Sequence, residues 1–312
     1  MRSNTKRLKT LREFLRERGI LPNLSSVILN AAEACKYIRA ALNNPNRFSL
    51  TETYNVYGDQ VSYLDLKSDE IMLAYMTKCR QVREYASEDR PKSVHLFHRD
   101  RAQYCVASDP LDGSSLVTVN LAVGSIVGVY DGDFFKRPII GAVYVIYGPL
   151  TTLVYAVKGR GAHEFVLDER SKQFVLSREN LRLNTSGSIY GTSSYDPIDD
   201  ARHHEFISKL AHSKYKTRYS GCFVADANHI LMKQGGIFCY PSTVSQYPTG
   251  KLRKFFECDP ISLIFEEANG LSSNGRIRML KKKTATLTDT SPIYIGSKGE
   301  VKLAESILGG KY

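Results

Sequence analysis

The chain has 312 residues, 42% of them hydrophobic and 24% charged, which is ordinary for a globular protein and excludes the disordered and fibrous classes. No apolar run approaches the ~18 residues of a membrane helix, and the basic N-terminus lacks the apolar block of a secretory signal. The six cysteines form no CxxC pair, which indicates free thiols in a reducing compartment.

The net charge of +11 is concentrated in two short segments. Residues 1–18 and residues 276–283 each carry an excess of five positive charges, so the rest of the chain is nearly neutral. A nucleic-acid-binding protein more often spreads basic residues over one face with aromatic residues between them. We therefore favour two solvated basic segments over an RNA-contacting surface.

The first half of the chain reads as helices followed by a β-rich stretch. Leucines at helical spacing (Leu8, Leu11 and Leu15) predict a first helix, and a second begins at Leu24 and ends before Pro45. A third helix is expected over residues 65–80. Strands are predicted over residues 84–86, 103–108, 123–130, 139–147 and 153–158.

From about residue 183 short strands and helices alternate. Helices are expected over 199–211, 223–233 and 259–269, the last ended by Gly270 in a left-handed conformation, and strands over 237–240 and 292–295. The fold class predicted is α/β, an α+β layered sandwich of two domains. Residues 1–183 would pack helices on a largely antiparallel sheet, and residues 184–312 would form an α/β domain.

The densest chemistry is the heptad Asp109-Pro110-Leu111-Asp112-Gly113-Ser114-Ser115, directly after a predicted strand. Two carboxylates three residues apart suit Mg²⁺, which prefers oxygen ligands and keeps positions open for phosphate oxygens. Gly113 permits close backbone approach, and the two serines can cradle a phosphate at a helix start.

Three other acidic groups could complete a metal site: Glu88 with Asp89, Asp59 with Asp65, and Glu257. Each alone is typical of a surface carboxylate, a helix cap or an ion-pair partner. Only a shared site would make them functional, and composition does not show that they meet.

The heptad matches the signature of the magnesium-dependent, lithium-sensitive phosphomonoesterase superfamily. In order along the chain, further motifs resemble the class I fructose-1,6-bisphosphatases: residues 55–61, 87–89, 218–221, 224–226, 236–238, 251–253 and 257–258. Other stretches look closer to sedoheptulose-1,7-bisphosphatases: residues 114–117, 147–149, 163–165 and 226–228. The resemblance spans about residues 50 to 305 and implies the sugar-phosphatase fold.

The resemblance also implies roles for individual residues. The magnesium ligands would be Glu88, Asp109, Asp112, Glu257 and the carbonyl of Leu111, holding two or more Mg²⁺ ions for which Mn²⁺ can substitute. Asp89, with Asp65 and Asp59 behind it, would orient and deprotonate the attacking water; most relatives have Glu in place of Asp89.

Substrate contacts follow in the same way. Gly113, Ser114 and Ser115, beside Asp112, would cradle the phosphate that is cleaved, and Lys251, Tyr219 and Tyr240 would hold the sugar and the distal phosphate. Arg218 resembles a residue that reaches a neighbouring subunit's site, which implies a homodimer or homotetramer.

The function we expect is magnesium-dependent hydrolysis of the 1-phosphate of a ketose bisphosphate, with sedoheptulose 1,7-bisphosphate as the first candidate. Residues 191–195 replace a hexose-type segment near the distal phosphate, which favours the seven-carbon sugar. Fructose 1,6-bisphosphate, alone or with dual specificity, is the first alternative, and a non-catalytic RNA-binding protein is a remote one.

The expected partner is a small sugar bisphosphate, with no nucleic acid and no membrane. The expected location is cytoplasmic, without a secretory signal or a plastid transit peptide. The ending Gly310-Lys311-Tyr312 leaves a glycosome or peroxisome-like organelle as the alternative.

Overall fold

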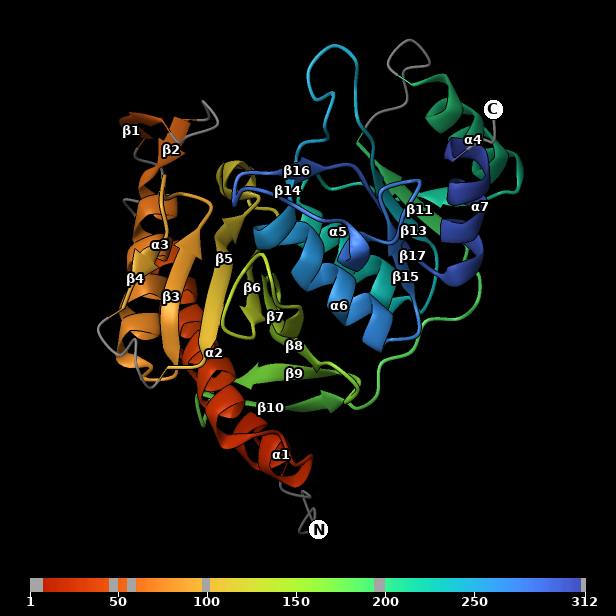
Figure 1. Cartoon of the computed structure of the whole chain (residues 1–312). Helices are drawn as coiled ribbons and strands as arrows, with labels where there is room; N and C mark the ends of the chain where they lie inside the picture. The colour runs from red at the N-terminus through yellow and green to blue at the C-terminus, as the bar shows by residue number, and fades with distance from the viewer. Residues whose placement is uncertain (1–7, 45–49, 55–59, 97–101, 194–199, 310–312) are drawn as a thin grey trace, which may run out of the picture.

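The computed structural model describes residues 8–44, 50–54, 60–96, 102–193 and 200–309. Helices and sheets alternate in five layers, helix–sheet–helix–sheet–helix, which Figure 1 shows from left to right. Asp59, residues 194–199 and the last three residues lie outside the described part.

The larger sheet belongs to the N-terminal half and has eight strands in the order β10-β9-β8-β7-β6-β5-β3-β4. All neighbours are antiparallel except β3 and β5, so the prediction of a largely antiparallel sheet is confirmed. The strands are β3 (Val82–Ser87), β4 (Val94–His95), β5 (Tyr104–Asp112), β6 (Val123–Tyr130), β7 (Ile139–Tyr147), β8 (Thr151–Val157), β9 (Ala162–Asp168) and β10 (Gln173–Arg178).

The smaller sheet is mixed, with five strands in the order β12-β11-β13-β17-β15. These are β11 (Ile189–Thr192), β12 (Lys216–Thr217), β13 (Ile237–Tyr240), β15 (Leu271–Ser273) and β17 (Ile293–Gly296). Two separate strand pairs complete the β-structure, β1 (Leu50–Tyr54) with β2 (Gln60–Ser62) and β14 (Leu252–Arg253) with β16 (Thr290–Ser291).

Helices cover both faces of each sheet. The outer layer on the larger sheet is α1 (Leu11–Glu17), α2 (Pro22–Leu42) and α3 (Tyr63–Lys78), and the outer layer on the smaller sheet is α4 (Ala201–His212) and α7 (Lys298–Leu308). The middle layer is α5 (Phe223–Met232) and α6 (Asp259–Glu267), which lie between the two sheets. The described residues also include three short segments: the 3₁₀ turn η2 (Ser114–Val119), the π-turn η3 (Lys254–Cys258) and the 3₁₀ turn η4 (Met279–Lys281).

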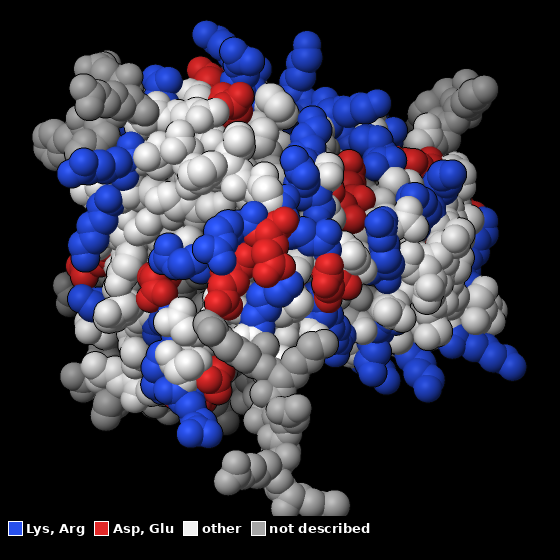
Figure 2. Space-filling model, turned by 90° about the horizontal axis from the view of Figure 1, so that it is seen from below, with Lys and Arg blue, Asp and Glu red and all other residues white. Residues whose placement is uncertain are grey.

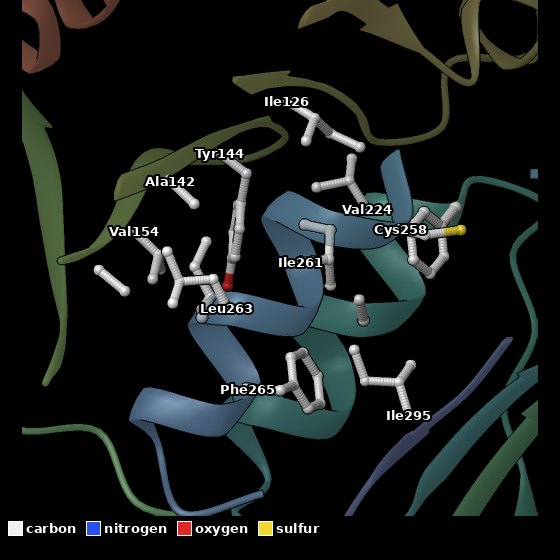
Figure 3. Packing of buried hydrophobic residues seen from close by; sticks show 14 of the residues in the cluster. Ile126, Ala142, Tyr144, Val154, Val224, Cys258, Ile261, Leu263, Phe265 and Ile295 are labelled. Carbon is white, nitrogen blue, oxygen red and sulfur yellow. The ribbon is translucent and has the colours of Figure 1, made fainter. Parts of the chain in front are cut away.

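The middle layer joins the two halves through one hydrophobic core. Figure 3 shows Ile126 and Tyr144 of the larger sheet directed toward Ile261 and Leu263 of α6, with Ile295 of the smaller sheet on the far side. The Tyr144 hydroxyl donates to Asn228 Oδ1 in α5 (2.9 Å), so its buried polar end is satisfied.

The ends of several elements differ from the prediction for local reasons. Helix α3 begins at Tyr63 because Ser62 and Asp65 form a capping box, so Asp65 lies in its first turn. Strand β5 continues to Asp112, past the predicted end at residue 108, because it keeps pairing with β6 across a register shift.

The prediction for Gly270 is wrong. Helix α6 ends at Glu267, and Asn269 takes the left-handed conformation (φ 67°) that Gly270 was expected to adopt. A Cβ at residue 270 would lie 2.7 Å from the carbonyl oxygen of Gly296, so the glycine allows close packing against β17. Strands β9 and β10 were not predicted.

Among the described residues, no helix combines the length and apolar character needed to cross a bilayer. Figure 2 shows one face on which Lys and Arg side chains are interspersed with Asp and Glu, so that face is not a continuous basic surface. All six cysteines are buried with free thiols.

We expect stability to be most sensitive to shortened side chains in the middle layer. Ile261 is fully buried between the sheets, whereas Ile277 is 48% exposed. Ile261→Ala should lower the free energy of unfolding by about 2–5 kcal/mol, because it removes buried methyl groups and leaves a cavity. Urea unfolding of both variants checks this; an equal loss in the Ile277→Ala control would contradict it.

Candidate active site

A cavity of about 240 Å³ opens where the ends of β3 and β5 meet the segment before α6. Most of the residues singled out from the sequence line it. The lining consists of Asp65, Glu88, Asp89, Asp109, Leu111, Asp112, Gly113, Ser114, Ser115, Gly221, Phe223, Tyr240, Lys251, Leu252, Arg253 and Glu257.

Asp109 is held in place by its own strand end. It is 5% exposed, and its Oδ1 accepts a hydrogen bond from the Leu111 amide (3.0 Å). The Ser125 hydroxyl of β6 donates to the Pro110 carbonyl (2.6 Å), which ties this strand end to its neighbour. The carboxylate of Asp109 is therefore fixed before any ligand arrives.

Three carboxylates from different parts of the chain converge on one point. Carboxylate oxygens of Glu88, Asp109 and Glu257 all lie within 4.8 Å of one another. Glu88 follows β3, Asp109 lies in β5 and Glu257 lies in the π-turn η3. The structure thus brings together acidic groups that are up to 169 positions apart in the sequence.

Burial and mutual repulsion dominate the electrostatics of this cluster. Burial, followed by repulsion from Glu88, raises the pKa of both Asp109 and Glu257 well above the usual carboxyl range. One cation already lies beside the cluster: the Arg253 guanidinium pairs with Glu88 Oε1 (3.1 Å). A divalent cation would offset the remaining charge, and an all-oxygen donor set fits Mg²⁺ or Mn²⁺.

Arg253 was given no role in the sequence analysis. Besides pairing with Glu88, its backbone amide donates to Glu257 Oε2 (2.6 Å), so one residue positions two of the three carboxylates. The sequence pointed to Arg253 only through its position in the motif of residues 251–253. That position did not distinguish an arginine that positions the carboxylates from a solvated one.

Asp112 lies beside the three carboxylates but faces α5. Its Oδ2 accepts from the Val224 amide (2.5 Å) and from the Cys222 thiol (3.4 Å), which ties the strand end to the first turn of that helix. Burial raises its pKa, and the amide of Val224 works against that rise. Asp112 and Leu111 line the cavity, so both can reach an occupant.

Asp89 and Asp65 both line the cavity, close enough for the charge of Asp65 to affect Asp89. Burial and the neighbouring Glu88 and Asp65 raise the pKa of Asp89 well above the usual carboxyl range. The Asp65 Oδ2 accepts from the Ser62 amide (2.7 Å) in the capping box, and burial raises its pKa. The predicted third member, Asp59, is outside the described residues.

The turn after Asp112 has the expected shape for a phosphate cradle. Gly113 has φ 79°, and a Cβ there would lie 2.8 Å from the Cys222 side chain, so only glycine fits. Ser114 and Ser115 begin the 3₁₀ segment η2 and line the cavity. Their amides are therefore at a helical N-terminus, where anions are favoured.

The residues expected to contact the sugar are only partly together. Tyr240 and Lys251 line the cavity, and Tyr219 stacks on Phe238 beside it (ring centroids 6.4 Å apart). Burial and the proximity of Tyr240 raise the pKa of Tyr219 to about 12. Arg218 is exposed, lies outside the cavity and donates from Nη1 to the Thr217 carbonyl (2.7 Å).

Comparison with known proteins gives a consistent result over nearly the whole chain. The family model described as "Fructose-1-6-bisphosphatase, N-terminal domain" matches residues 9–179, and that of the C-terminal domain matches residues 183–309. A "Fructose-1,6-bisphosphatase class 1" from Trichlorobacter lovleyi is 39% identical over 314 residues, covering 98% of this chain and 97% of its own.

Solved structures agree. The chain superposes on Leishmania major fructose-1,6-bisphosphatase in its holo form with a TM-score of 0.91 at 27% identity, over 97% of this chain and 99% of that one. It also superposes on a Toxoplasma gondii protein provisionally assigned as a sedoheptulose-1,7 bisphosphatase, with a TM-score of 0.87 at 25% identity over the same fractions.

Two family models in the right order, relatives near 40% identity and a shared two-domain fold lead to one assignment. The chain belongs to the class 1 fructose-1,6-bisphosphatase family and is a phosphoric monoester hydrolase of the sugar-bisphosphatase kind.

Proposed function

We propose that this chain removes the 1-phosphate of fructose 1,6-bisphosphate with the help of divalent metal ions. The observation that carries the proposal is the meeting of Glu88, Asp109 and Glu257 within 4.8 Å, beside the turn of Gly113 to Ser115. The choice of the six-carbon sugar is supported by the names of the bacterial relatives.

In this proposal the three carboxylates would hold the metal ions, with Asp112 and the Leu111 carbonyl as further ligands. The chemistry that Mg²⁺ would supply there is Lewis-acid polarisation of the phosphoryl group and a lower pKa for water. The amides and hydroxyls of Ser114 and Ser115 bind the oxygens of the phosphate that leaves.

Asp89 is the proposed general base. Its carboxyl lines the same cavity as the three carboxylates, and Asp65 lies nearby to orient the water that Asp89 deprotonates. Lys251 and Tyr240, which line the cavity, would hold the sugar and its distal phosphate together with Tyr219. The exposed position of Arg218 fits a contact to a neighbouring subunit, and the homo-oligomer stays a prediction.

Sedoheptulose 1,7-bisphosphate is the second candidate, and the Toxoplasma gondii neighbour supports it. The main sequence argument for this substrate was the segment of residues 191–195, and the structure gives that segment little support. The Thr192 hydroxyl bonds the His203 ring (3.0 Å), Thr192 does not line the cavity, and residues 194–195 of that segment lie outside the described part. The remote RNA-binding alternative does not account for the buried carboxylates, which would repel a polyanion in the absence of metal.

If the carboxylates bind metal, substituting one of them should affect the melting temperature and the turnover in different ways. Glu257→Gln removes one of three mutually repelling charges, so the metal-free variant should melt at least as high as the wild type. The same change should abolish the rise in melting temperature that Mg²⁺ produces and should lower turnover by several orders of magnitude. Melting curves with chelator and with Mg²⁺, together with phosphate release, measure both effects.

The control for this experiment is Glu70→Gln, which removes a carboxylate from an exposed pair with Lys67. It should leave both melting curves and turnover unchanged. Full activity of Glu257→Gln, or of the wild type in chelator, would refute the metal site.

The base makes a second prediction. Asp89→Asn keeps the shape of the side chain but cannot accept a proton, so kcat should fall by about 10²–10⁴-fold with little change in KM. Asp89→Glu restores a carboxylate with one more methylene, the residue usual in relatives, and should retain far more activity than Asn. If the Asn and Glu variants are equally impaired, the loss comes from packing and the assignment of Asp89 as the base fails.

Substrate choice is the third prediction. Both sugars present the same 1-phosphate, so discrimination depends on contacts to the rest of the molecule, worth about 1–3 kcal/mol for one or two polar groups. We expect kcat/KM for fructose 1,6-bisphosphate to exceed that for the seven-carbon substrate by about tenfold or more. Specificity constants measured side by side in one Mg²⁺ buffer decide this, and the reverse order would assign the chain to the second candidate.

A further inference from the structure

A second cavity, of about 650 Å³, lies against the π-turn η3 that carries Glu257. Lys254 and Phe255 of that turn line this second cavity, whereas Glu257 lines the acidic one. The other walls are the β6–β7 turn, Lys158 after β8, helix α6 along its length and residues 278–284. The basic segment that stood out in the sequence therefore has a defined place, beside a cavity.

The charges around this cavity are unequal. Eight basic side chains and only three acidic ones line it, an excess of five positive charges. Each acid has a partner within the protein. Both oxygens of Asp259 accept from Lys254 (2.6 Å each), and Glu266 pairs with Arg278 (3.0 Å). The two oxygens of Glu267 accept from the amides of Gly159 and Gly161 (2.8 and 2.9 Å).

The remaining cations are less fully paired than the acids, although Lys136 lies close enough to Asp133 to lower the pKa of that carboxyl. Five of them form no ion pair with the residues that the structure describes: Lys136, Arg137, Lys158, Lys281 and Lys283. They come from three separate segments, the β6–β7 turn, the end of β8 and the region of η4, and they line one cavity. All five are exposed, but they border one cavity and do not lie on separate parts of the surface, so their fields add there.

Lys282 also lines the cavity and is partly buried. It donates to the Thr290 carbonyl (2.7 Å), and burial lowers its pKa. The cavity also has an apolar wall. Phe135 is 50% exposed and meets Phe255 edge to face, with ring centroids 5.5 Å apart. A volume of this size is within the range of small-molecule sites.

We propose that this cavity is a second ligand site, separate from the acidic centre, for a small molecule that carries two or more phosphate groups. The lysines and Arg137 bind the phosphate oxygens, as the cations in phosphate sites do, and the exposed Phe135 packs against the rest of the ligand. Lys254 and Glu257 belong to the same π-turn, η3. A ligand that contacts Lys254 would therefore contact the structural element that also positions Glu257 in the acidic cavity.

The test uses inorganic tripolyphosphate as the probe and isothermal titration calorimetry on the full chain, in metal-free buffer at about 0.1 M salt. Lys281→Ala/Lys283→Ala should weaken binding at least tenfold. A matched pair of exposed lysines outside the cavity, Lys233→Ala/Lys302→Ala, removes the same charge and should change binding by less than twofold. Lys251→Ala, in the acidic cavity, should also leave the dissociation constant within twofold.

Three outcomes would overturn the proposal: no binding below millimolar concentration, an equal loss in both lysine pairs, or a loss confined to Lys251→Ala. The first lysine pair should keep its activity on the sugar bisphosphate without the probe, which separates this test from that of the proposed function.

Hydrogen exchange of the wild type gives a second measurement that needs no variant. Binding of the probe should slow exchange in residues 134–139 and 278–284, which line the second cavity. Slower exchange only in residues 109–115 would place the probe in the acidic centre and refute the second site.

Discussion

The arrangement of this molecule depends on keeping three like charges close together in a buried place. Glu88, Asp109 and Glu257 repel one another and lose hydration, and both effects oppose folding. Fixed donors offset part of that cost: the Arg253 guanidinium and amide, and the Leu111 amide. Hydrophobic packing of the middle helices against both sheets offsets more of it. The site is therefore assembled before a metal arrives, at the expense of stability.

The position of the middle layer explains how distant segments can share this site. Helix α6 follows the π-turn directly and packs between both sheets, so the core that joins the halves also fixes Glu257 relative to β5. Asp112 adds a second connection, because it bonds the first turn of α5 from the end of the same strand. The geometry of the acidic cluster and the packing of the two sheets thus depend on one set of contacts.

Much of this was predictable from local pattern. The apolar runs of β6 and β7 predicted both strands to the residue, and the heptad at Asp109 supplies several residues that line the acidic cavity. Local sequence pattern could not predict which residues would contact one another in the folded chain. The pairing of Arg253 with Glu88, the left-handed conformation of Asn269 after α6, and the strands within 162–178 all depend on tertiary neighbours. The preference for the seven-carbon sugar rested on residues such as Thr192, whose hydroxyl the fold uses to bond His203.

The burial of the thiols has a consequence for how such an enzyme responds to its surroundings. Cys222 packs against Gly113 and Asp112 at the edge of the acidic cavity, where a modified sulfur would leave no room for the turn. Burial raises the pKa of Cys35 to about 11 and of Cys105 to about 12, and it raises the pKa of Cys222 well above the usual thiol range. Because oxidants and alkylating agents react with the thiolate, these sulfurs serve as packing volume and are slow to react. We therefore expect oxidants to modify Cys35, Cys105 and Cys222 slowly, so a change in the redox state of the surroundings would leave the packing of the Gly113 turn intact.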